Sequence, residues 1–138
     1  MATIAAILFS AIIVLAIGLL FYYGEKEPEV SILDNSIQIK AMYGLNVDLS
    51  DIDEISFIEK SMNDIGVGRR TNGYDGIGEA LKGDFKSDTL GDVLLFVCSK
   101  SSPTIKISRF SDKDIYISYK DREKTKKLFN ELTLRIPQ

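Results

Sequence analysis

Apolar residues occur along this chain in three different patterns, and each pattern predicts a different kind of element. Residues 2–23 form an unbroken run of apolar and small side chains, the middle of the chain alternates between apolar and polar positions, and the C-terminal part has apolar residues three and four positions apart. An unbroken run favours a membrane-spanning helix, alternation favours half-buried strands, and the last spacing favours an amphipathic helix. We therefore expect an apolar helix followed by a mainly β domain that ends in a helix.

The N-terminal run has the length and composition of a transmembrane anchor. At about 1.5 Å per residue, a helix over residues 2–23 is about 33 Å long and spans a hydrocarbon core of about 30 Å. The first 24 residues contain no Asp, Glu, Lys or Arg, and Tyr22 and Tyr23 stand where interfacial aromatic residues belong. The chain divides accordingly into an anchor, a linker and a domain: residues 1–24, 25–29 and 30–138.

Two other interpretations of this run were weighed against the anchor. A cleaved signal peptide would have a basic first region, a shorter apolar core and a small-residue cleavage site, none of which is clear here. A buried core helix would normally keep one polar face, whereas this run is apolar all round. Lys26 follows the run, and Lys and Arg gather on the cytoplasmic side. The expected location is therefore the cell membrane, with a single pass and a cytoplasmic domain.

The alternating middle of the chain predicts about seven short strands between residues 30 and 119. Asp34-Asn35 is expected to form a two-residue hairpin turn, because both residues tolerate left-handed backbone conformations. The strongest strand is expected at Asp92–Ser99, which carries the sequence DVLLFVCS. Residues 61–79 are expected to form a long connection. Many short strands with short connections indicate a sandwich or a barrel.

The period changes from alternation to a helical spacing at the end of the chain. Thr125, Leu128, Phe129 and Leu132 lie on one face of a helix, and Asp121 is a suitable residue to cap its first turn. A single apolar stripe must be buried. We expect this helix to close the open end of a strand barrel.

Four stretches of this sequence resemble the bacterial pleckstrin-homology-like (PH-like) domain families. They are YGLNVDLSDIDEISFIEK, GRRTNGYDGIGEALKGDF, VLLFVCSKSSPTIKIS and IYISYKDREKTKKLFNEL, and the resemblance covers roughly residues 30–134. It implies a seven-stranded antiparallel barrel or sandwich capped by a C-terminal helix, in families that often carry the domain beside N-terminal transmembrane helices. It implies no established reaction and no defined ligand, because fold does not imply function.

The glycine-rich segment between residues 66 and 83 is the candidate binding site. It holds six of the chain's ten glycines. Glycines let backbone N–H groups form concave anion sites, and the forked guanidinium groups of two adjacent arginines suit carboxylate or phosphate. The candidate residues for binding a ligand or partner are Arg69, Arg70, Asn72 and Tyr74.

Two structural alternatives compete with a binding site in this segment. The segment can be a plain connection, with Asn72-Gly73 as a tight hairpin turn. Alternatively, the arginines pair with acidic residues of a neighbouring turn, namely Asp48, Asp51 or Asp53. A glycine-rich connection needs no ligand to explain it.

Composition argues against several other functions. The chain has no histidine and one cysteine, Cys98, so it lacks the commonest general base and metal ligand and cannot form an internal disulfide. We expect no catalytic residues, metal or cofactor. The net charge of −3 disfavours nucleic-acid binding. The resemblance to PH-like domains implies that a phosphoinositide headgroup would be held by cations around the first hairpin turn. Phosphoinositide binding is therefore disfavoured, because this turn, Asp34-Asn35, carries no cation.

The sequence therefore predicts a non-catalytic, membrane-anchored PH-like interaction module with a protein partner. The alternative is a sensor domain that binds a small anion or a peptide at the Gly-Arg-Arg segment.

Overall fold

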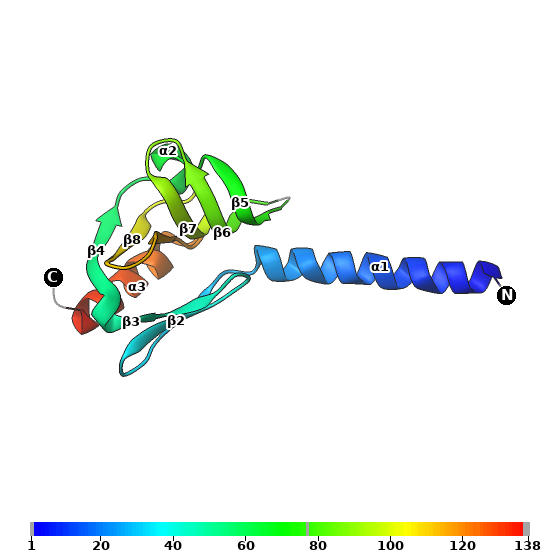
Figure 1. The fold of residues 1–138 in the computed structure, drawn as a ribbon, viewed down its shortest axis with the longest axis horizontal. Coiled ribbons are helices and arrows are strands. Elements are labelled where there is room, and N and C mark those ends of the chain that lie inside the picture. The colour runs from blue at the N-terminus through cyan, green and yellow to red at the C-terminus, as the bar shows by residue number, and fades with distance from the viewer. Residues whose placement is uncertain (1, 77, 137–138) are drawn as a thin grey trace.

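A computed structural model describes residues 2–76 and 78–136 of the chain. An N-terminal helix, α1 (Ala2–Glu25), projects from a domain that contains nine strands and two further α-helices within these ranges (Figure 1). The start of α1 and the C-terminal helix lie at opposite ends of the molecule (Figure 1). The sequence-based division into an apolar helix and a β-rich domain is thus confirmed.

Helix α1 is long and apolar enough to cross a membrane. The most apolar 18-residue stretch within Thr3–Glu25 has a mean hydropathy of 3.0, and none of its residues is buried. A lone helix of this kind at the N-terminus is shared by membrane anchors and signal sequences. What sets this helix apart is the way its last turn meets the domain.

The first three strands form a small antiparallel sheet directly after α1. These are β1 (Glu29–Ile32), β2 (Ser36–Lys40) and β3 (Leu45–Asp48), in the order β1-β2-β3. Ile32 pairs with Ile37, so Asp34 and Asn35 lie in the hairpin turn, as the sequence predicted. A single 3₁₀ turn, η1 (Leu49–Asp51), then leads into the second sheet.

The second sheet has six strands in the order β4-β8-β9-β7-β6-β5. The strands are β4 (Ile52–Ile58), β5 (Arg69–Asp75), β6 (Ala80–Ser87), β7 (Gly91–Cys98), β8 (Thr104–Arg109) and β9 (Asp114–Ile117). All neighbouring pairs are antiparallel except β7 and β9, which run parallel. The β8–β9 hairpin therefore folds back so that its second strand, not its first, lies beside β7.

The expected seven-stranded barrel or sandwich is confirmed only as a β-rich fold with a C-terminal helix, whereas the closed barrel and the number of strands are wrong. The strands form two sheets, of three and six strands, and these sheets do not close on one another. Alternation along a sequence marks a strand and its buried face, but it does not identify the neighbouring strand. The parallel pairing of β7 with β9 is the feature that alternation did not predict.

The six-stranded sheet buries apolar side chains on both faces. On one face, Leu94 and Phe96 of β7 share a core with the small sheet and with helix α3 (Arg122–Arg135). On the other face, Leu95 and Phe85 pack beneath the short helix α2 (Met62–Ile65). Burial on both faces explains why β7 is a continuous apolar run rather than an alternating one.

Helix α3 confirms the predicted amphipathic helix and its cap. The Asp121 carboxylate accepts a hydrogen bond from the Glu123 backbone N–H at 2.9 Å. Leu128 and Leu132 are buried, whereas Phe129 is half-buried with its ring 5.0 Å from that of Phe57. The helix packs on a sheet face instead of closing the mouth of a barrel.

Residues 61–79 are not one long connection, contrary to the expectation. They contain α2, which begins after a Ser61 hydroxyl that accepts from the Asp64 N–H at 3.2 Å, and then the edge strand β5. Gly66 and Gly68, both with positive φ, make the bend between these two elements. The glycines therefore serve a helix-to-strand transition as well as a strand.

Candidate functional site

Strand β5 carries all four residues that the sequence marked as candidates. It forms the outer edge of the six-stranded sheet, with β6 as its only strand neighbour in the described chain. Arg69, Arg70 and Asn72 are exposed, and Tyr74 is buried. The Asn72-Gly73 turn considered as an alternative is wrong, because both residues pair with β6 within the strand.

The structure separates the two arginines. Arg69 pairs with Lys86, and Arg70 pairs with the buried Phe85. Successive side chains of a strand point to opposite faces. Arg69 therefore shares a face with Lys86, and Arg70 lies on the face that holds Phe85. The strand therefore directs the two arginine side chains to different faces of the sheet.

Neither arginine side chain has a hydrogen bond or ion pair within residues 2–76 and 78–136, so the suggested pairing with the acidic turn does not form. One oxygen of Asp51 instead accepts from the backbone N–H and the hydroxyl of Ser111, at 3.1 and 2.8 Å. Arg69 also lies opposite another exposed cation, Lys86, which is unfavourable between neighbouring strands. This edge of the sheet therefore carries cationic groups without a counter-charge among the residues that the structure describes.

Tyr74 belongs to a different site, the junction between the domain and the end of α1. Its ring is 93% buried and meets the Phe21 ring edge-on, with 6.3 Å between the ring centroids. Gly24 lies directly beneath the ring, where a Cβ would collide with it. The absence of a side chain at residue 24 thus lets the tyrosine cover the last turn of the helix.

Lys82 is the central residue of this junction, and the sequence analysis missed it. The side chain is 99% buried, and its ammonium donates to the carbonyl oxygens of Gly24 at 2.8 Å and Lys26 at 2.6 Å. Carbonyls at the C-terminal end of a helix have no partner within the helix, and a cation is favoured there by the helix dipole. Burial nevertheless lowers the pKa of Lys82, and Glu25 and Glu27 oppose that effect.

The Tyr74 hydroxyl and Oε2 of Glu25 are buried together in the junction, where the hydroxyl interacts with the Glu25 carboxylate. Burial raises the pKa of Tyr74 to about 12, and the nearby Glu25 carboxylate adds to the rise. Gly78 leaves room for the other oxygen of Glu25, because a Cβ at residue 78 would collide with Oε1.

Beside the junction lies a cavity of about 490 Å³. Its walls come from the end of α1, the linker to β1, and the adjoining ends of β6, β7 and β9, and they include Glu25, Pro28, Glu79, Val97, Cys98 and Ser118. The volume lies within the usual range for small-molecule sites.

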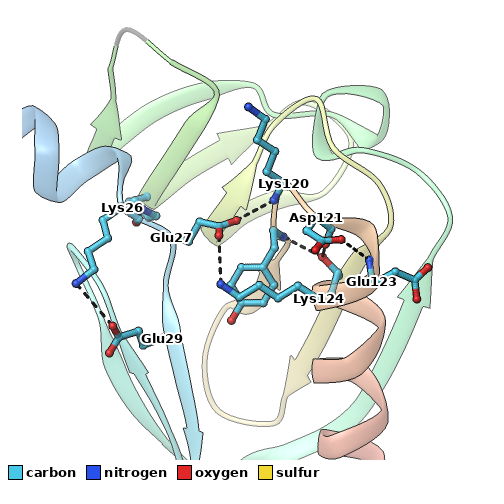
Figure 2. A network of polar contacts seen from close by, with 10 residues as sticks. Lys26, Glu27, Glu29, Lys120, Asp121, Glu123 and Lys124 are labelled. Atoms are coloured by element: carbon cyan, nitrogen blue, oxygen red, sulfur yellow. Dashed lines mark hydrogen bonds and ion pairs between the residues drawn. The ribbon is translucent and has the colours of Figure 1, made fainter.

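Glu27 closes one side of this cavity by linking three segments. Its carboxylate accepts from the Lys120 backbone N–H at 2.8 Å and from the Lys124 ammonium at 3.2 Å (Figure 2). The linker after α1 is thereby tied to the start of α3. Figure 2 shows the Lys120 side chain extending away from this contact.

Cys98 lies in the cavity wall, half-buried, with its Sγ 3.7 Å from Oε2 of Glu79, to which it donates. Burial raises the pKa of this thiol. A raised pKa keeps the group protonated, whereas a nucleophile or metal ligand must be the thiolate. Within residues 2–76 and 78–136, no three side chains of His, Cys, Asp or Glu are grouped to hold a metal ion.

Comparisons with known proteins place the chain in no family. No protein-family model, curated protein or solved structure matches it.

Proposed function

We propose that the chain is a non-catalytic, membrane-anchored interaction module that presents strand β5 to an acidic, extended segment of a partner protein. The observation that carries the proposal is the exposed sheet edge at β5, with cations that have no counter-charge within the described residues. An open edge offers backbone groups to an added strand, and the arginines add charge complementarity.

The junction supports a retained anchor over a cleaved signal peptide. Cleavage near residue 24 would remove the Gly24 carbonyl from the buried Lys82 ammonium and uncover the Tyr74 ring. Signal peptides are removed from the mature protein, so a domain that built its core on one would lose those contacts. These contacts of Lys82 and Tyr74 are kept only if α1 stays attached to the domain.

The resemblance to PH-like domains supports an interaction module beside a membrane. Of the architecture that the resemblance implies, the β-rich body and the amphipathic helix after the last strand are present, whereas the closed barrel is not. Membership of those families stays a proposal that rests on the quoted sequence stretches. The interaction role does not depend on it, because it is argued from β5.

An extended partner accounts for the arginines better than a small anion does. Because Arg69 and Arg70 lie on opposite faces, only a ligand that runs along the strand can meet both. A β-bulge between Arg70 and Asn72 interrupts the pairing with β6 at this point. Bulges and charges on an edge strand also oppose unspecific pairing, so we expect a selective partner rather than self-association.

Charge reversal on β5 tests this proposal. We expect the double variant Arg69→Glu/Arg70→Glu to cross-link at least tenfold less of its native partner than the wild type does. The amount of cross-linked partner is measured in native membranes by quantitative mass spectrometry. The matched control is Lys60→Glu/Lys100→Glu, which reverses two exposed lysines away from β5 and should keep the partner. An identical partner set for wild type and the β5 variant would contradict the proposal.

A further inference from the structure

Some of the charged groups that line the cavity beside the junction are not paired with another charged group of the described chain. Three carboxylates and two ammonium groups line it. Both oxygens of Glu27 are engaged by Lys120 and Lys124, and the Lys82 ammonium is engaged by two carbonyls. The carboxylates of Glu25 and Glu79 and the ammonium of Lys120 remain.

The two remaining carboxylates have unused acceptor capacity. Among the described residues the Glu25 carboxylate faces only the Tyr74 hydroxyl, and the Glu79 carboxylate accepts only from the weak thiol donor of Cys98 at 3.7 Å, so each keeps free lone pairs. A carboxylate binds most strongly to an ionised N–H donor. The adjoining wall of Pro28 and Val97 offers apolar surface to a short carbon chain.

From this arrangement we propose that the cavity binds a small zwitterion that carries a primary ammonium group. The carboxylates of Glu25 and Glu79 accept from the ammonium, and Lys120, whose ammonium has no partner among the described residues, attracts the anionic group. A primary ammonium supplies three N–H donors, which a quaternary ammonium lacks. The proposal stands independently of a partner at β5.

The position of the cavity suggests two sources for such a ligand. Glu25 is the last residue of α1 and follows Tyr22 and Tyr23, which stand at the membrane interface if α1 spans the bilayer. The cavity then lies at the level of the lipid headgroups. An ethanolamine phospholipid headgroup and soluble glycerophosphoethanolamine carry the same zwitterion, because both are phosphodiesters with one negative charge and one primary ammonium.

Cys98 is a built-in reporter, because it is the only cysteine of the chain and lines the cavity. The experiment measures the rate of maleimide labelling of the full chain in phospholipid nanodiscs. Three conditions are compared: phosphatidylcholine alone, phosphatidylcholine with phosphatidylethanolamine, and phosphatidylcholine with soluble glycerophosphoethanolamine. We expect an ammonium ligand to slow labelling at least fivefold relative to phosphatidylcholine alone.

If only the lipid protects Cys98 from labelling, the cavity is a headgroup site. If only the soluble compound protects Cys98, the ligand is a soluble one. Protection by both shows that the zwitterion itself is sufficient for binding. Equal labelling rates in all three conditions would overturn the proposal and leave a water-filled cavity. A change in lipid composition could also slow the labelling of Cys98 without any ligand in the cavity. Variants of the cavity carboxylates separate this effect from ligand binding.

Glu25→Gln and Glu79→Gln should each abolish the protection of Cys98. Protection is the ratio of the labelling rates without and with ligand, measured within the same variant, and its loss brings this ratio to about one. Glu59→Gln is the matched control, since Glu59 pairs with Arg122 outside the cavity and its loss should leave the ratio unchanged. Unfolding transitions of each variant report whether the fold persists. If Glu25→Gln fails to fold, Glu79→Gln decides, and protection that persists in a folded variant would refute the site.

Discussion

At the residue scale, the behaviour of Lys82 departs most from what its type normally does. Lysine is almost never fully buried unless it is paired. Here the ammonium is paired with two backbone carbonyls instead of a carboxylate, so the cost of burying the charge is offset by hydrogen bonds that also complete the end of α1. One side chain thereby joins the central part of β6 to the helix that precedes the domain.

Replacing this lysine should weaken the junction. We expect Lys82→Met to lower the free energy of unfolding of the detergent-solubilised full chain by about 1–3 kcal/mol, because the buried Gly24 carbonyl and the partly buried Lys26 carbonyl lose their donor. Urea unfolding followed by circular dichroism provides the measurement. Lys86→Met, at an exposed position of the same strand, is the control and should change stability by less than about 0.5 kcal/mol. Equal stability of the two variants would contradict the role assigned to Lys82.

The sequence could not have predicted this contact. The partner carbonyls lie 58 and 56 residues away along the chain, and backbone carbonyls leave no trace in a residue pattern. The exposed candidates Arg69, Arg70 and Asn72 were found because adjacent arginines among glycines are unusual. Tyr74 was grouped with them by proximity in sequence, yet it faces α1, because the strand turns its side chain to the junction.

At the element scale, local periodicity predicted most helices and strands. The apolar helix, the first hairpin and the terminal helix depend on spacings within one segment, and all three are present. Strand β5 escaped prediction because it has exposed polar residues and glycines instead of apolar alternation; it is a strand because β6 supplies its hydrogen-bond partners. Edge strands of this kind are defined by a neighbour, not by their own pattern.

Helix α3 offers a comparison of two leucines within one turn of each other. Leu132 is fully buried, whereas Leu134 is 86% exposed. We expect Leu132→Ala to cost about 2–5 kcal/mol of stability, since it leaves a cavity between the helix and the sheet. Leu134→Ala should cost less than about 0.5 kcal/mol. Thermal unfolding of the two variants side by side measures the difference, and similar losses would show that this stripe is not core.

At the scale of the whole molecule, the closed barrel was expected from strand number and from the PH-like resemblance, and both arguments failed at the same step. Neither alternation nor strand count specifies that β9 lies parallel to β7, or that the first three strands pair only with one another. Strand pairing depends on contacts between distant segments. The sequence therefore predicted the elements and the apolar helix but not the arrangement of the sheets.

The same scale connects α1 with the proposed interaction surface. Tyr74 and Lys82, on adjacent strands, both contact the last turn of α1, and Tyr74 belongs to the strand that carries the arginines. The helix is thus joined directly to the sheet edge instead of being connected through a free linker. In the proposed anchored state, this junction would hold β5 at a fixed orientation to the membrane.

The most direct test of the account is the intact mass of the native protein recovered from membranes washed with alkaline carbonate. The account predicts that the protein stays in the membrane pellet and that its mass includes all of α1, because Lys82 and Tyr74 use the end of this helix as part of the folded structure. A mature protein that is released into solution and begins after residue 24 would contradict it, since α1 would then be a signal sequence.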